Sequence, residues 1–236
     1  MTPQQLLARA SALSESGGRR LLGITGPPGA GKSTLAAQLV TGLRGRAVSV
    51  PMDGFHLAEQ ELRRLGRTRR KGAPDTFDPL GYAALLGRLR DQRHPTVVYA
   101  PAFDRGLEEP VAGSIPVTAD VPLVITEGNY LLLDEEPWSG VRQLLDEVWY
   151  VQLDDVERVR RLVDRHEHFG RSRPAAERWV RESDEANARR VVGSRHRSDL
   201  VVSLPTGPPW LDVEEPAEKR QVQRPGSSYE GGGEPG

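Results

Sequence analysis

Short apolar runs recur along the chain, and each ends abruptly in polar or glycine-rich residues. The runs are 21–25 (LLGIT), 47–50 (AVSV), 96–100 (TVVYA), 122–126 (PLVIT), 148–153 (VWYVQL) and a weaker one at 199–204 (DLVVSL). Helical patterns lie between several of them, for example over 32–43 and 80–89. Continuous apolar runs separated by helices are typical of strands buried on both faces. The pattern therefore predicts an α/β fold built on a parallel sheet.

The two ends of the chain depart from this pattern. Thr2, Pro3 and Gln5 form a capping-box signature that predicts a helix within residues 1–18. Residues 205–236 are rich in proline, glycine and charge, a composition that predicts a disordered tail. Docking of Trp210 and Leu211 onto the domain is the alternative for the tail.

The composition narrows the classes of function. The 236 residues carry a formal net charge of -1, which argues against a nucleic-acid partner. Cysteine is absent, which excludes disulfides, thiolate metal sites and a cysteine nucleophile. Neither a signal-peptide pattern nor an apolar run of about 18 residues is present, so we expect a cytoplasmic protein without a membrane partner.

A glycine-rich motif follows the first apolar run. Residues 26–33 match G-x-x-x-x-G-K-[ST], directly before an amphipathic helical pattern. The backbone N–H groups of such a loop approach a polyphosphate, the lysine contacts the β- and γ-phosphates, and the serine hydroxyl ligates Mg²⁺. Only 3 of the 32 basic residues are lysines, and one occupies the required position. We therefore expect Gly26, Pro27, Pro28, Gly29, Ala30, Gly31, Lys32, Ser33 and Thr34 to bind a nucleotide.

Acidic residues follow three other apolar runs. Because the carboxyl ends of parallel strands meet at one edge of a sheet, Asp53, Asp104 and Glu127 are expected near the phosphate loop. Phosphoryl transfer to an alcohol uses one carboxylate to accept the hydroxyl proton and another near Mg²⁺. Asp53 suits the first role and Glu127 the second, with Ser33 as the other metal-side group. The alternatives are a helix cap at Asp53, an arginine partner for Glu127 and a surface Asp104–Arg105 pair.

The segment after the fifth run is rich in arginine. Val156, Val159 and Val163 are expected to form the apolar stripe of a helix that ends at Gly170. Arg158, Arg161 and Arg165 share another face, and Arg171 and Arg173 follow on a flexible segment. Arginines on a lid can stabilise a transferring phosphoryl group while the lid excludes water, which predicts a lid at 165–176. A solvated helix with Glu157–Arg161 and Arg160–Asp164 pairs is the alternative, and His166 and His168 are expected at the surface.

Residues 54–95 form an insertion that we expect to bind the acceptor. Its basic run at 63–71 is interpreted as solvated or as a contact to an anionic substrate. Asp78 either caps a helix or binds substrate. His56 in the insertion and Tyr99 beyond it are candidates for hydrogen bonds to an acceptor hydroxyl, or for ordinary half-buried polar groups.

Taken in order, these motifs resemble those of the uridine kinase, pantothenate kinase and phosphoribulokinase superfamily. The resemblance runs from about residue 21 to 204 and rests on GPPGAGKST, PMDGFHL, RRKGAPDTFD, VVYAPAFDR, LVITEGNYLLL and the arginine-bearing lid. It implies a five-stranded parallel sheet, ATP with Mg²⁺, Asp53 as catalytic base and Glu127 as a metal-side acid. It also implies lid arginines among Arg161, Arg165 and Arg173. Some of the most similar members are described as sugar (fructose) kinases.

The chain departs from two named members at acceptor positions. Uridine kinases carry a histidine just after the aspartate that Asp104 resembles, and here Arg105 follows. Pantothenate kinases carry a histidine two residues after the tyrosine that Tyr99 resembles, and here that position is Pro101. The acceptor therefore stays open, with Asp104, Arg105, His56, Tyr99, Asp78, Glu127 and Arg161 as candidate contacts.

These features predict one domain over 1–204 that acts as an ATP-dependent kinase. Its partner would be a small-molecule hydroxyl acceptor such as a sugar or nucleoside, and a homodimer is compatible with the sequence. Two other classes remain as alternatives, a regulatory ATPase or nucleotide switch that acts on a protein, and a nucleotide-binding module without turnover. No N-K-x-D or L-S-G-G-Q motif supports the switch.

Overall fold

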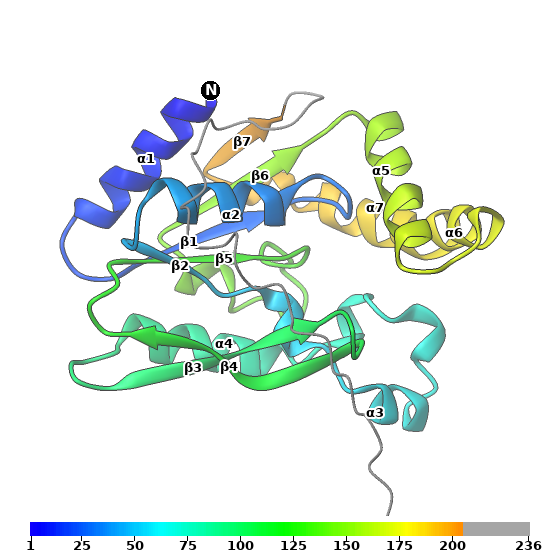
Figure 1. Cartoon of the computed structure of the whole chain (residues 1–236), viewed down its shortest axis with the longest axis horizontal. Coiled ribbons are helices and arrows are strands. Elements are labelled where there is room, and N and C mark those ends of the chain that lie inside the picture. The colour runs from blue at the N-terminus through cyan, green and yellow to red at the C-terminus, as the bar shows by residue number, and fades with distance from the viewer. Residues whose placement is uncertain (205–236) are drawn as a thin grey trace, which may run out of the picture.

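A parallel sheet forms the centre of the molecule (Figure 1). The computed structural model describes residues 1–204, so the predicted tail lies outside the described residues. The strand order is β2-β5-β1-β6-β7, with every neighbouring pair parallel. The strands are β1 (Arg20–Thr25), β2 (Ala47–Ser49), β5 (Leu123–Glu127), β6 (Glu147–Gln152) and β7 (Leu200–Ser203). The predicted α/β fold with five parallel strands is confirmed.

Helices cover both faces of this sheet. In Figure 1, α1 (Pro3–Glu15) and α2 (Lys32–Gly42) lie on one face and α4 (Pro79–Arg90) lies on the other. The remaining helices are α3 (Glu59–Arg64), α5 (Asp155–His168), α6 (Arg173–Trp179) and α7 (Glu185–Gly193), with a π-helical turn over Val180–Asp184. Across residues 1–204, none of the helices combines the length and the apolar character that crossing a bilayer requires.

The core consists of two apolar layers separated by the sheet. Leu22 and Ile24 of β1 pack with α1 and α2, whereas Leu21 packs on the opposite side with α4. Successive side chains of a strand point to opposite faces, so a strand covered on both faces must be apolar throughout. This explains the continuous apolar runs that predicted the sheet.

The amino-terminal helix forms as its capping signature predicts. The Thr2 hydroxyl accepts a hydrogen bond from the Gln5 N–H, and the Gln5 side chain accepts one from the Thr2 N–H. Leu6 and Ala10 lie on the side of the helix that faces the sheet, and both are buried there. The helix therefore belongs to the domain.

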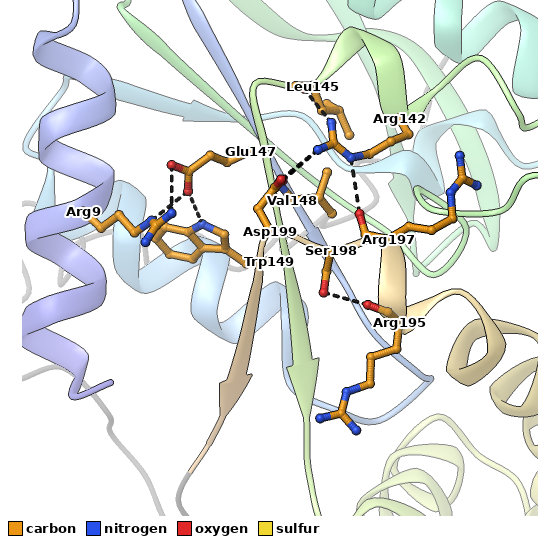
Figure 2. Close-up of polar contacts among 10 residues, drawn as sticks. All are labelled: Arg9, Arg142, Leu145, Glu147, Val148, Trp149, Arg195, Arg197, Ser198 and Asp199. Atoms are coloured by element: carbon orange, nitrogen blue, oxygen red, sulfur yellow. Dashed lines mark hydrogen bonds and ion pairs between the residues drawn. The ribbon is translucent and has the colours of Figure 1, made fainter.

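Polar contacts at the start of β6 hold α1 and β7 in place, as Figure 2 shows. Arg9 donates two hydrogen bonds to the Glu147 carboxylate, at 2.8 and 3.2 Å, and the Trp149 indole donates a third at 2.8 Å. The Asp199 carboxylate accepts hydrogen bonds from Arg142 at 2.9 Å and from the Val148 N–H at 2.7 Å. Charge-assisted contacts of this kind are stronger than neutral ones, so they fix the sheet edge.

One apolar run does not join the central sheet. Residues 96–100 contribute to β3 (Val97–Asp104), which pairs antiparallel with β4 (Glu109–Thr118) in a separate hairpin. Along β3, Val98 and Ala100 are buried while Val97 and Tyr99 are exposed, which is the alternation of a strand covered on one face. The prediction that Asp104 ends a strand of the parallel sheet was therefore wrong, and β4 was not foreseen.

The apolar stripe predicted for α5 is partly wrong. Val163 is buried and Val159 packs beside it as predicted, but Val156 is 80% exposed, and the helix buries Leu162 and the Arg158 side chain instead. The aliphatic stem of an arginine can be buried when its guanidinium finds partners, a possibility that counting only apolar residues overlooks. The two alternative i,i+4 pairs are present, with Glu157–Arg161 at 2.7 Å and Arg160–Asp164 at 2.7 Å.

Asp199→Ala should destabilise the fold. It leaves the buried Val148 N–H without its hydrogen-bond acceptor, and we expect the free energy of unfolding to fall by about 1–3 kcal/mol in urea titrations. Asp134→Ala removes an exposed aspartate elsewhere and should change stability by less than about 0.5 kcal/mol. Equal stabilities of the two variants would contradict the role given to Asp199.

Candidate active site

The carboxyl ends of the central strands carry the predicted catalytic residues to one edge of the sheet. Ile24 of β1 lies opposite Glu127 of β5, and Ser49 of β2 lies opposite Ile125. The segments that follow these strands line a cleft of about 870 Å³, which contains Lys32, Asp53 and Glu127. Ligands bind at this edge in open α/β sheets.

The phosphate loop packs closely against α5. Gly29 has a φ of +81°, and a Cβ atom there would lie 2.7 Å from Cγ of Leu162 and 2.9 Å from the Arg158 carbonyl oxygen. Only glycine fits such an approach without displacing the helix. The loop is therefore tied to the helix from which the predicted lid begins.

Lys32 lies buried at the end of this loop, with 8% of its surface exposed. Its Nζ donates a hydrogen bond to the Pro27 carbonyl oxygen at 3.1 Å. Burial lowers the pKa of Lys32 to about 8, although the nearby Glu127 and Asp53 carboxylates act in the opposite direction. The hydrogen-bond partner of this ammonium group is a neutral carbonyl, and a bound polyphosphate would give it a negatively charged partner.

Ser33 and Glu127 meet where a metal ion would be needed. The Ser33 hydroxyl donates a hydrogen bond to Glu127 Oε1 at 2.9 Å. Burial and the neighbouring Asp53 raise the pKa of Glu127, while Lys32 and Ser33 oppose the shift. Mg²⁺ is typically held by one or two protein oxygen ligands together with substrate phosphates and waters. This pair of oxygen donors fits that pattern.

Asp53 stands on a short 3₁₀ turn, Met52–Phe55, after β2. The turn packs so closely on the residue after Glu127 that a Cβ atom at Gly128 would lie 2.5 Å from Cβ of Met52. The Asp53 carboxylate remains 34% exposed toward the cleft and pairs with Arg105 at 3.6 Å. The structure thus holds a solvent-accessible carboxylate beside the phosphate loop.

His56 lines the cleft next to Asp53. Its Nδ1 donates a hydrogen bond to the Asp53 carbonyl oxygen at 2.8 Å, and its ring packs on Phe77 and Phe103. Burial lowers the pKa of His56, so the neutral form is favoured. With Nδ1 fixed as a donor, a neutral His56 has Nε2 as an acceptor, which suits a hydroxyl ligand.

The predicted lid comprises the end of α5, residues 169–172 and the start of α6, and two of its arginines, Arg165 and Arg171, line the cleft. Arg165, near the end of α5, lines the cleft. Arg161 pairs with Glu157 at 2.7 Å, and Arg173 pairs with Glu167 and Glu177 at 3.2 Å each. Neither Arg161 nor Arg173 is among the residues that line the cleft.

His166 is not the plain surface residue that we expected. Its Nε2 lies 2.8 Å from Asp184 Oδ2, and the two side chains are 15% and 11% exposed. Both residues line the cleft, and Asp184 belongs to the π-helical turn. π-helical turns are frequent at functional sites. The two residues are 18 positions apart in the sequence, so no local pattern indicated that they would pair.

Besides Arg161, three other predicted substrate contacts do not line the cleft. Asp78 caps α4 by accepting a hydrogen bond from the Gly81 N–H at 2.8 Å, and Tyr99 is 57% exposed on β3. The Asp104 carboxylate accepts hydrogen bonds from the N–H groups of Gly106 and Leu107, at 2.7 and 2.9 Å, and stabilises a turn. Asp78 thus takes the helix-cap alternative, whereas Asp104 caps a turn and does not form the expected pair with Arg105, which pairs with Asp53.

Several cleft residues escaped the sequence analysis. Lys71 donates a hydrogen bond to the Glu108 carbonyl oxygen at 2.6 Å and lies 5.2 Å from the centre of the Phe103 ring. Phe103 and Phe169 also line the cleft, and each ring centre lies 5.7 Å from Arg105, a candidate contact from the sequence that does line the cleft. Lys71 had a usable signal, because the rarity of lysine that marked Lys32 applies to it as well. The aromatic residues had none, since they are distant in sequence.

Comparisons with known proteins agree with this geometry. A family model described as "Phosphoribulokinase / Uridine kinase family" matches residues 21–205. A candidate uridine kinase from Schizosaccharomyces pombe is 36% identical over 171 residues, which cover 69% of this chain and 72% of that protein. An ATP-dependent kinase-like protein from Aspergillus versicolor is 37% identical over 153 residues, covering 61% of this chain and 88% of the relative.

A solved structure shows the same fold. The crystal structure of a candidate fructose transport system kinase from Silicibacter sp. TM1040 superposes with a TM-score of 0.76 at 35% identity, covering 86% of this chain and 99% of that one. The family match, these relatives and the phosphate-loop geometry agree on the class of enzyme. The chain belongs to the phosphoribulokinase / uridine kinase family and is a P-loop kinase, a phosphotransferase that acts on a hydroxyl acceptor.

Proposed function

We propose that the protein transfers the γ-phosphoryl group of ATP to a hydroxyl group of a sugar, nucleoside or related small metabolite. The observation that carries this proposal is the presence of Lys32, Ser33, Asp53 and Glu127 in one cleft beyond the strand ends. The cleft continues past Asp53 between the insertion and α5, which leaves room for an acceptor. A nucleotide switch would need no such acceptor half.

The phosphate groups would lie against the loop and Lys32. Mg²⁺, held by Ser33 and Glu127 when bound, would neutralise charge on the β- and γ-phosphates. Lys32 would add a positive charge that costs little reorganisation, because burial already fixes its side chain. The nucleoside would lie in the adjoining pocket of about 530 Å³ beside Pro27, which Tyr150 and Arg195 also line.

Asp53 would accept the proton of the attacking hydroxyl group. Its carboxylate is exposed to the acceptor half of the cleft, as a general base must be. Arg105, 3.6 Å from this carboxylate, would hold it in a fixed orientation. His56 Nε2, on the same wall, would accept a hydrogen bond from another acceptor hydroxyl.

Arg165 would stabilise the transferring phosphoryl group. It lines the cleft, whereas Arg161 and Arg173 would have to give up carboxylate partners to reach it. Its position near the end of α5 couples it to the phosphate loop, because α5 packs on Gly29. Closure of the helices around the cleft would exclude water and so limit wasteful hydrolysis of ATP.

Asp53→Asn tests the general base. We expect acceptor phosphorylation to fall by about 10²–10⁴-fold, because the amide cannot take the proton, while ATP affinity changes by less than about twofold. Asp91→Asn, at the exposed end of α4, is the matched control and should keep full activity. Steady-state kinetics and nucleotide titration measure the two effects. Normal turnover by Asp53→Asn would remove Asp53 from the mechanism.

Lys32→Ala tests the phosphate contact. ATP binding should weaken by about 10–100-fold, since a buried charge-assisted contact is lost, whereas adenosine binding should stay within about twofold. Calorimetric titration with both ligands gives the ratio. Lys71→Ala removes a lysine on the acceptor side and should leave ATP affinity unchanged. A parallel loss of adenosine affinity in Lys32→Ala would show general damage to the site instead.

The pKa of Lys32 predicts how ATP binding depends on pH. The pKa of about 8 means that Lys32 in the free protein loses its proton as the pH rises through 8 and must regain it when phosphate binds. ATP affinity should therefore fall above pH 8, by at most about tenfold per pH unit. The Lys32→Ala variant should lack this dependence between pH 7 and 9.5. An identical slope in both proteins would rule out Lys32 as its source.

A further inference from the structure

A second pocket adjoins the acceptor side of the cleft. It has a volume of about 610 Å³ and lies between residues 69–75 of the insertion and the stretch formed by α6, the π-helical turn and α7. In Figure 1 the cyan segment that contains α3 approaches these helices from below. The pocket includes part of the basic run at 63–71, which the proposed chemistry at Asp53 does not use.

The two walls of this pocket are fixed to each other. The buried Asn187 of α7 donates a hydrogen bond from Nδ2 to the Gly72 carbonyl oxygen at 3.3 Å, and the Tyr130 hydroxyl donates to the same oxygen. The Trp138 indole donates to the Pro74 carbonyl oxygen at 3.2 Å. One hydrogen bond therefore joins the two walls, and the other two hold the insertion wall against the core of the domain.

The lining of the pocket carries an excess of positive charge. Five arginines line it, together with only two carboxylates: Arg69, Arg70, Arg171, Arg178 and Arg190, with Asp75 and Glu182. Arg70 is paired with Asp75, and Arg190 is paired with Glu135. Within the described part of the chain, Arg69, Arg171 and Arg178 have no carboxylate at ion-pair distance. Three guanidinium groups are thus available to an anion.

Arg171 is held in position by an aromatic ring. Its guanidinium carbon lies 3.9 Å from the centre of the Trp179 ring, which is a stacked cation–π contact. Arginine fixed in this way presents its planar donors without losing further conformational freedom, and these donors match the oxygens of a phosphate or carboxylate. The Arg171 and Trp179 side chains therefore form a rigid edge of the pocket.

This edge is shared with the cleft that contains Asp53. Arg69, Arg171, Trp179 and Asn187 line both spaces. A single ligand can therefore extend from the phosphate-transfer end, past Arg69 and Arg171, into the arginine-rich pocket. The cleft itself does not have this excess of charge, since its basic residues are accompanied by Asp53, Glu59, Glu108, Glu109, Glu127 and Asp184.

We propose that this pocket is an anion subsite for the acceptor, so that the substrate carries a phosphate or carboxylate group away from the hydroxyl that is phosphorylated. The proposal rests on the proposed kinase function for its biological meaning. Arg69, Arg171 and Arg178 bind the anionic group, and their distance from Asp53 selects which hydroxyl is presented. Neutral sugars and nucleosides leave these arginines without a ligand and are poor substrates.

Binding of a simple anion tests the subsite without any turnover. Inorganic phosphate is titrated by calorimetry into the full chain carrying Lys32→Ala, which weakens the phosphate loop, and into the same protein with Arg69→Ala and Arg178→Ala added. Both arginines are exposed, so their removal should not disturb the fold. We expect phosphate binding to weaken at least tenfold in the second protein. The matched control adds Arg88→Ala and Arg93→Ala to the Lys32→Ala protein, which removes two exposed arginines near the other end of the insertion. Its affinity for phosphate should change less than twofold. Unchanged phosphate binding without Arg69 and Arg178 would overturn the proposal.

Matched acceptors test its consequence and identify the anion. Wild-type protein with ATP and Mg²⁺ is offered families of compounds that share a carbon skeleton, such as glucose, gluconate and glucose 6-phosphate, or ribose, ribonate and ribose 5-phosphate. Product formation is read by mass spectrometry. We expect an anionic member to exceed its neutral parent at least tenfold in kcat/KM, and this advantage to disappear in the Arg69→Ala/Arg178→Ala variant. Comparing kcat/KM for the carboxylate and the phosphate of each family shows which anionic group the pocket binds.

The two experiments separate the subsite from the kinase reaction. Phosphate binding that depends on Arg69 and Arg178, without phosphorylation of any compound, would support the subsite and contradict the proposed acceptor class. Equal phosphorylation of a neutral parent and its anionic partner, unaffected by the two substitutions, would support the kinase and overturn the subsite.

Discussion

The parallel pairing of β2, β5 and β1 is the constraint on which the site depends. Because these strands run in one direction, the phosphate loop, the Asp53 turn and Glu127 all emerge at the same edge of the sheet. The Thr126 hydroxyl donates a hydrogen bond to the Val50 carbonyl oxygen at 2.6 Å, which fixes the segment before Asp53 against the end of β5. Sheet topology therefore performs most of the positioning that catalysis requires.

A second layer of contacts joins the phosphate loop to the helices that frame the acceptor. Arg158 is almost fully buried, and its guanidinium donates hydrogen bonds to the Pro28 carbonyl oxygen at 3.3 Å, to Asp155 at 2.9 Å and to Glu185 at 2.6 Å. A buried charge is tolerated only when its donors are satisfied in this way. The loop, α5 and α7 are thus connected through one side chain.

Sequence reasoning succeeded where chemistry is local. The phosphate loop, the capping box at Thr2 and the strand-end residues Asp53 and Glu127 were predicted from short motifs, and the structure brings Lys32, Ser33, Asp53 and Glu127 together. The sequence did not predict contacts between segments that are distant along the chain. The β3–β4 hairpin, the His166–Asp184 pair and the wall made by Arg171 and Trp179 all depend on contacts that no local pattern encodes.

Residues with two plausible roles show a related limit. Asp78, Tyr99 and Asp104 sit in motifs that resemble substrate contacts, yet the carboxylates of Asp78 and Asp104 serve their own backbone turns and Tyr99 faces solvent. Two of the arginines expected on the lid, Arg161 and Arg173, form ion pairs with neighbouring glutamates and do not line the cleft. Arg165 does line it. Such competition for partners becomes visible only in three dimensions.

The central claim is that one edge of the sheet places the γ-phosphate of ATP beside Asp53. A crystal structure of the full chain with Mg²⁺ and a non-hydrolysable ATP analogue tests this most directly. We expect a terminal phosphate bound by Lys32 and facing the Asp53 carboxylate across the space for an acceptor hydroxyl, with the metal ion on the side of Ser33 and Glu127. A terminal phosphate directed away from Asp53, or a nucleotide bound elsewhere, would contradict it.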